Sequence, residues 1–207
     1  DKALYIGVIA HDNEPLAIIS TDSRRDSSLD DTDSFRVLID GLLDRQNGYV
    51  FGTNPAGIEF DGQVVREGTN QIISGGEGGL NLNWDTPWNV KSAVSSTGWS
   101  TEMEIPFTSL RFGTAEVQTW GFNFERRIRR NNEIAYWAPL SQERSLTQVS
   151  EAGSIEGIRV PRKRNLQLTP YVLGKTRRGG ALTQSESKDE FGFDLKYSIT
   201  SSLTLDA

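Results

Sequence analysis

The stretch GWSTEMEIPFTSLR, residues 98–111, decides the fold class. Its side chains alternate between one face of an extended chain and the other, which is the pattern of a half-buried β-strand. The inward set is Trp99, Thr101, Met103 and Ile105, and the outward set is Ser100, Glu102 and Glu104. Pro106 lacks an N–H and ends the strand, and a short turn then folds Phe107 and Leu110 back onto the core. The stretch therefore predicts a central strand of a sheet protein.

Short alternating or apolar runs separated by turn residues continue this pattern on both sides. We expect further strands at 4–10, 16–20, 34–40, 48–54, 58–61, 90–96, 117–127, 134–139 and 153–160. Runs 34–40 and 48–54 predict an antiparallel hairpin in which Phe35, Val37 and Ile39 point inward. An all-β, antiparallel protein follows from this pattern.

Composition excludes several classes of function. The 207 residues carry a net charge of -6, which argues against a nucleic-acid surface, because such surfaces are basic. The absence of cysteine excludes disulfides, thiolate catalysis and cysteine-type zinc sites. Since the chain begins directly in a strand pattern, we expect that upstream residues precede it.

An acidic loop over residues 21–33 is a candidate calcium site, because Ca²⁺ takes six to eight oxygen ligands. The candidate ligands are Asp26, Asp31 and Asp33. A solvated loop in which Arg24 and Arg25 neutralise the aspartates explains the same residues. His11, the single histidine, is either a metal or haem ligand or a surface residue at a strand end.

Two tryptophans, Trp84 and Trp88, flank a turn and are candidates for an aromatic platform that stacks on a sugar ring. The alternative interpretation is that they cap the edge of a sandwich.

Glu102 and Glu104 lie about 7 Å apart on one strand face, within the range of glycosidase carboxyl pairs. The alternative is that they form cross-strand ion pairs with Arg126 or Arg127.

The last segment differs in composition. A short basic linker at 161–164 leads to two alternating runs, 166–173 and 191–200. The second run keeps apolar residues on one face for about ten residues, the length of a membrane-spanning β-strand. A soluble hairpin would have the same pattern.

The chain resembles the family 9 carbohydrate-binding module superfamily, in the version that precedes a large outer-membrane β-barrel in Gram-negative bacteria. The matching stretches are ALYIGVIAHDNEP, DDTDSFRVLID, YVFGTNPAGIEFD, GWSTEMEIPFTSLRF and WGFNFERRIRRNNEIAYWAP, and LQLTPYVLG and FGFDLKYSITSSLTLDA resemble the opening of the barrel. The resemblance implies an immunoglobulin-like β-sandwich at 1–160, a linker at 161–164 and the first barrel strands at 165–207. It places the module at the periplasmic face of the outer membrane.

Family members clamp a terminal sugar between two tryptophans, with charged side chains bonding its hydroxyls. At the four matching positions this chain has Asp30, Arg36, Gly52 and Leu146, so the usual clamp is absent. A glycan would have to use other aromatic residues, namely Trp84, Trp88 or Trp137. The resemblance implies a non-catalytic module linked to carbohydrate catabolism, whose partners are an oligo- or polysaccharide and its own barrel. The alternatives are a structural or gating domain of that barrel and, more weakly, a glycoside hydrolase.

Overall fold

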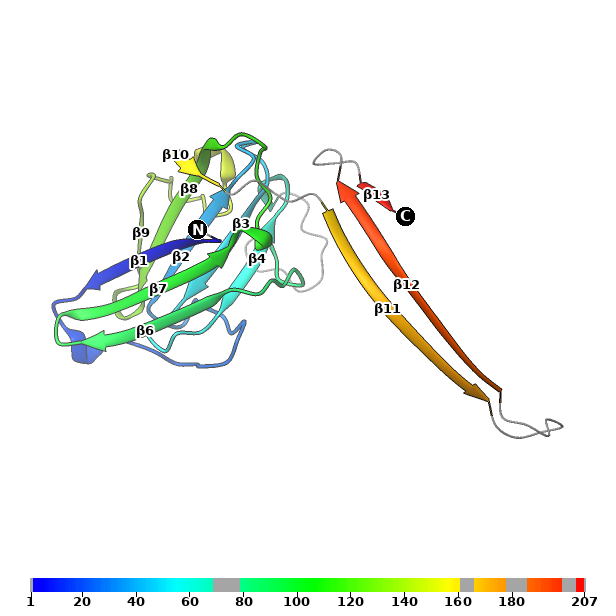
Figure 1. Ribbon diagram of the computed structural model, residues 1–207. Coiled ribbons are helices and arrows are strands. Elements are labelled where there is room, and N and C mark those ends of the chain that lie inside the picture. The colour runs from blue at the N-terminus through cyan, green and yellow to red at the C-terminus, as the bar shows by residue number, and fades with distance from the viewer. Residues whose placement is uncertain (1, 69–78, 161–165, 178–185, 199–203, 207) are drawn as a thin grey trace. The chain divides into compact units, whose positions relative to one another are not determined.

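Strand β7 (Gly98–Pro106) is the central strand of a three-stranded antiparallel sheet in the computed structural model of the chain (Figure 1). Its neighbours are β1 (Ala3–His11) and β6 (Asn89–Ser95). The structure describes residues 2–68, 79–160, 166–177, 186–198 and 204–206. The inward residues of β7 are buried, and Phe107–Ser109 forms a single 3-10 turn (η3). These features confirm the strand and turn predicted from residues 98–111.

A second antiparallel sheet forms the other layer of the sandwich. Its strands, in spatial order, are β10 (Gly153–Arg159), β8 (Val117–Ile128), β2 (Ser34–Asp40), β3 (Gly48–Thr53), β4 (Phe60–Val64) and β5 (Leu80–Asn81). Strand β9 (Glu133–Tyr136) also pairs with β8. The predicted hairpin of residues 34–40 and 48–54 is the β2–β3 pair.

The main core lies between the two sheets. Its members include Val37, Phe51, Trp99, Met103 and Trp120, and they come from strands of both sheets. Burial of these large apolar side chains is the main force that holds the layers together. The chain is therefore an all-β, antiparallel sandwich, as the sequence predicts.

The outer face of the second sheet is also covered. Every residue of β2 is buried, because Val37 and Ile39 face the main core while Leu38 faces a second apolar cluster. Leu29, from the loop before β2, is fully buried in this second cluster. The second cluster also contains Leu146, Val149 and Ala152, which lie in or beside the turn η5 (Val149–Glu151). The expectation of a solvated loop at 21–33 is therefore wrong at Leu29, because that side chain seals the sheet.

The strand predicted at 16–20 is also wrong. Residues Pro15–Ala17 form a 3-10 turn (η1), and Leu16 is fully exposed. The carbonyl of Ile19 accepts hydrogen bonds from the backbone N–H of Asp33 and the hydroxyl of Thr32. The Ile19 N–H donates to the carboxylate of Asp33. This backbone is satisfied by the loop before β2 instead of by a strand.

The chain divides into two units, Asp1–Pro161 and Arg162–Ala207. In the second unit, β11 (Leu166–Arg177) pairs with β12 (Glu186–Ser198), which also pairs with β13 (Thr204–Asp206). The expected linker at 161–164 lies outside the described residues.

Two further 3-10 turns are η2 (Arg66–Gly68) and η4 (Arg129–Asn131). Over the described ranges, no helix is long and apolar enough to cross a membrane.

Candidate functional site

A cluster of charged side chains lies on the outer face of the second sheet. Arg36 of β2 stands directly opposite Glu125 of β8 in the strand register. Nη1 of Arg36 lies 3.8 Å from Oε1 of Glu125, which is ion-pair distance. From the loop before β2, Oδ1 of Asp30 accepts from Nη2 of Arg36 at 3.3 Å and lies 2.7 Å from Nη2 of Arg127. We name these four residues the Arg36 cluster.

The Arg36 cluster has buried atoms without hydrogen-bond partners. The side chains of Arg36 and Glu125 are 10% and 4% exposed. Within the described ranges, Nε of Arg36, Nε of Arg127 and Oε1 of Glu125 have no hydrogen-bond partner. Leaving such groups unbonded costs about 1–3 kcal/mol each, so they mark a place where a polar ligand would gain binding energy.

Two aromatic side chains border the Arg36 cluster. The guanidinium of Arg36 lies 5.3 Å from the centre of the Phe60 ring, a cation–π contact. Tyr136 of β9 is paired with Glu125 in the register. Burial, followed by the charge and hydrogen bond of Glu125, raises the pKa of Tyr136 to about 12. Tyr136 therefore stays neutral at physiological pH and donates a hydrogen bond to Glu125.

The four positions that depart from the family clamp lie around this cluster. Asp30 and Arg36 belong to it, and a Cβ built on Gly52 would lie 3.1 Å from Cγ of Arg36 and 2.6 Å from Cδ1 of Leu29. Leu146 is buried with Leu29 in the second apolar cluster. The positions that the resemblance assigns to a sugar clamp are thus filled by core packing and an ion pair. The alternation of residues 117–127 puts Glu125 and Arg127 on one strand face, but nothing in the sequence shows that Arg36 lies opposite them.

The predicted pairing of Glu102 and Glu104 with Arg126 or Arg127 is wrong. Strand β7 pairs with β1 and β6, whereas β8 belongs to the other sheet. Glu104 accepts hydrogen bonds from the hydroxyl of Tyr5 at 2.9 Å and from Nδ2 of Asn89 at 3.2 Å. The hydrogen bond and charge of Glu104 raise the pKa of Tyr5.

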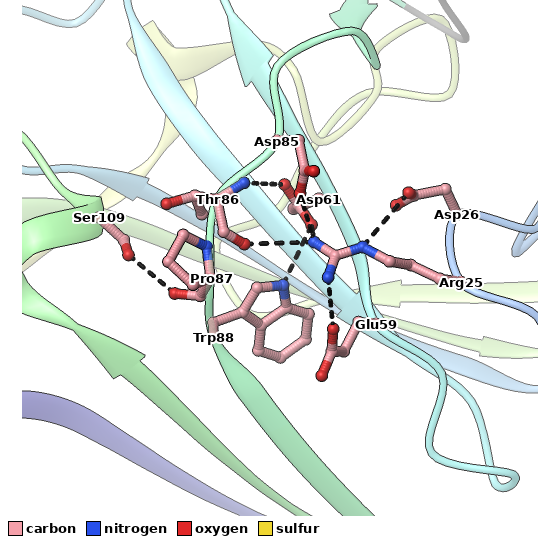
Figure 2. A network of polar contacts seen from close by, with 9 residues as sticks. All are labelled: Arg25, Asp26, Glu59, Asp61, Asp85, Thr86, Pro87, Trp88 and Ser109. Carbon is pink, nitrogen blue, oxygen red and sulfur yellow. Dashed lines mark hydrogen bonds and ion pairs between the residues drawn. The ribbon is translucent and has the colours of Figure 1, made fainter. Parts of the chain in front are cut away.

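Trp84 and Trp88 pack against the main core. Trp88 is 3% exposed and contacts the ring of Phe51 edge-on, and Trp84 lies 4.8 Å from the ring of Tyr49. Nε1 of Trp88 donates to Asp61 at 3.1 Å (Figure 2). The prediction that Trp88 stacks on a sugar is therefore wrong, because its ring is already buried, and Trp84 is turned toward the same core.

Arg25 lies at the centre of a network of carboxylates (Figure 2). Its guanidinium contacts four acidic side chains and the carbonyl of Thr86, and the acidic partners are Asp26 at 3.5 Å, Glu59 at 2.7 Å, Asp61 at 3.0 Å and Asp85 at 2.5 Å. Burial raises the pKa of Asp61 against the opposing effects of Trp88 and Arg25. The network joins the loop before β2 to the start of β4 and to the segment before β6.

Each of the three candidate calcium ligands already has a partner within the protein. Asp26 contacts Arg25, and Asp31 contacts Arg129. The carboxylate of Asp33 accepts from the backbone N–H groups of Ile19 and Arg129. In the part of the chain that the structure describes, no group of three or more His, Cys, Asp or Glu residues is placed to hold a metal ion. Calcium binding therefore stays a prediction from the sequence.

Trp137 is the most exposed of the three candidate tryptophans, at 54%, whereas Trp84 is partly buried and Trp88 is buried. Its backbone N–H donates to the carbonyl of Phe124, and its ring contacts the Phe124 ring edge-on. It lies over Gly153, where a Cβ would come within 2.4 Å of its Cζ3. The indole is thus held in place and can serve as a stacking surface.

His11 is exposed at the end of β1, and its carbonyl accepts a hydrogen bond from Arg126.

Comparison with known structures finds a protein of similar fold. The structure described as a putative carbohydrate-binding protein from Bacteroides uniformis aligns with a TM-score of 0.53 and 14% identity over 67% of each chain. This chain shares its fold. At this identity the likeness concerns the fold alone. No protein-family model and no curated protein matches the chain.

Proposed function

We propose that the sandwich is a non-catalytic carbohydrate-binding module that uses the Arg36 cluster. One observation carries the proposal: a buried donor, Nε of Arg36, and a buried acceptor, Oε1 of Glu125, lie in one cluster without hydrogen-bond partners among the described residues. A sugar hydroxyl both donates and accepts, so neighbouring hydroxyls match such a pair. Asp30 and Arg127 are 42% and 20% exposed and connect the buried pair to the surface.

The shared fold and the resemblance to family 9 modules support this proposal. Trp137 is proposed as a separate stacking surface, since its exposed ring packs on Phe124, which faces the main core, and therefore lies away from the Arg36 cluster.

The test is a calorimetric titration of the purified chain against a panel of neutral and acidic oligosaccharides. We expect saturable binding that Glu125→Gln weakens at least about tenfold, because hydrogen bonds to charged groups are the stronger ones. Glu102→Gln is the matched control, since that glutamate is exposed on the other sheet. Binding that tolerates Glu125→Gln, or no binding by the folded chain, would refute this site.

The second unit supports a finer proposal about location. Val172, Phe191 and Phe193 are 81%, 90% and 65% exposed, and the register pairs Val172 with Phe191 and Pro170 with Phe193. The hairpin belongs to a three-stranded sheet in the described part of this unit, and apolar side chains exposed to this degree mark a surface for an apolar neighbour. We therefore propose that this hairpin opens an outer-membrane β-barrel and that the sandwich is its periplasmic module.

Flotation with lipid vesicles tests the location. The chain is expected to float with the vesicles, and a variant with Phe191→Ser and Phe193→Ser is expected to stay in solution. Ile9→Ser with Val94→Ser is the control, since these exposed residues lie in the sandwich. Equal behaviour of both variants would contradict a membrane role of the hairpin and would favour a structural role without lipid.

A further inference from the structure

We propose that the Arg36 cluster binds the carboxylate of an acidic sugar, and that Asp30 holds that place when no ligand is bound. This inference rests on the proposed function and adds the chemical class of the ligand.

Asp30 is arranged as an internal substitute for a ligand. A single oxygen, Oδ1, contacts both Arg36 and Arg127, at 3.3 Å and 2.7 Å. The arginine side chains are 10% and 20% exposed, whereas Asp30 is 42% exposed and belongs to the loop before β2. The two cations are therefore held by the sheet, and the anion between them reaches solvent.

The arginines keep donors that Asp30 does not use. Over the described ranges, neither Nε of Arg36 nor Nε of Arg127 has a hydrogen-bond partner. A guanidinium binds a carboxylate most strongly through two parallel N–H bonds. A ligand carboxylate that replaced Asp30 could accept two parallel N–H bonds from one guanidinium, through its Nη2 and its unused Nε, and keep the local charge balanced.

The acceptor in the cluster distinguishes a sugar from an acidic peptide. Oε1 of Glu125 is buried beside Arg36 and has no hydrogen-bond donor among the described groups. A uronic acid carries hydroxyls next to its carboxylate, and one of them can donate to Glu125. The side chain of a peptide glutamate has no such hydroxyl beside its carboxylate and would leave Oε1 of Glu125 without a donor.

The experiment compares three probes by calorimetry with the purified chain: trigalacturonic acid, its neutral galactose counterpart and triglutamate. We expect the acidic sugar to bind about tenfold more tightly than the neutral sugar and than triglutamate. The preference should weaken as salt screens the charges.

Two variants test the role of Asp30. Asp30→Asn removes the internal competitor and should raise the affinity for trigalacturonic acid about tenfold. Arg127→Gln should abolish the preference for the acidic sugar. Arg24→Gln is the matched control, since Arg24 lies in the same loop and pairs with Asp22. Tryptophan fluorescence and thermal melting verify that each variant is folded.

The outcomes separate the two proposals. Equal binding of acidic and neutral sugars, lost on Glu125→Gln, would overturn the acidic preference and leave sugar binding at the cluster intact. Equal or tighter binding of triglutamate would overturn the acidic-sugar class. Weaker binding by a folded Asp30→Asn variant would overturn the substitute role of Asp30. No binding of any probe would overturn both proposals.

Discussion

Gly98 shows how one residue fixes the position of two strands. Its φ is +137°, and a Cβ there would lie 2.1 Å from the carbonyl oxygen of Ala10, in the strand paired with β7. Gly7 lies on the same strand pair, yet its Cβ position has no atom within 4 Å among the atoms that the structure describes. The two glycines therefore differ in what they tolerate.

Gly98→Ala is expected to lower the free energy of unfolding by more than about 1 kcal/mol, because both the backbone angle and the contact exclude a side chain. Gly7→Ala should change it by less than about 1 kcal/mol. Urea denaturation of both variants measures the difference. Similar losses would show that the close approach of β1 to Gly98 does not exist in solution.

Tyr136 gives a second prediction at this scale. Since burial and Glu125 raise its pKa from 10.0 to about 12, its contribution to stability is present below pH 10 and is lost as the pH rises towards 12. Tyr136→Phe has no proton to lose at this position. Its melting temperature should therefore fall less steeply than that of the wild type above pH 10. Parallel curves would contradict the buried contact with Glu125.

At the scale of elements, Arg25 joins three segments that are distant in the sequence (Figure 2). Arg25→Gln would leave the buried carboxylate of Asp61 without its cation. The free energy of unfolding should drop by about 1–3 kcal/mol at pH 7, a range reduced because Arg25 is partly exposed.

The pH dependence identifies the cause. The pKa of Asp61 is already raised by burial, and loss of Arg25 would raise it further. A carboxyl with a raised pKa binds more protons when folded, so the stability of the variant should recover as the pH falls from 7 to 5. Thermal melting at the two pH values measures this, with Arg24→Gln as the control. A loss that is the same at both values would mean that only packing was disturbed.

Single strands and turns were predicted better from the sequence than the pairing between strands. Residues 98–111 contain their own alternation, stop and turn, so β7 and η3 could be derived from local chemistry. The error at Glu102 and Glu104 has a physical reason. Alternation shows which side of a strand is apolar, but not which strand lies beside it, since pairing is decided by packing over long sequence distances.

The candidate site was harder to predict for the same reason. Arg36 stands in an apolar run, and its neighbour Glu125 comes from a strand about ninety positions later in the chain. Both tryptophans before β6 carry an aromatic signal that does not distinguish a ligand platform from a core. Trp137 could be named from the sequence but not ranked above Trp84 and Trp88. Its ring is positioned by Gly153 and Phe124, which come from other strands.

At the scale of the whole molecule, the sandwich depends on its shared core. Trp120 is fully buried, its Nε1 donates to Gln118 at 2.8 Å, and its ring stacks on Phe122. Trp120→Ala should cost about 3–5 kcal/mol in the free energy of unfolding. Trp137→Ala, which removes an exposed ring of the same type, should cost much less. Equal losses in urea denaturation would contradict this assignment of core and surface.

Strand β2 has a consequence for how such a sequence can change over generations. Each of its seven positions is buried, one face by the opposite sheet and the other by the loop before it. A substitution there meets packed neighbours on either side, whereas Tyr5, Gly7 and Lys91 face solvent on the other sheet. The sequence of β2 should therefore change slowly, and the exposed face of the β1–β7–β6 sheet should change fast. New binding specificities would arise at that exposed face with the least cost to folding.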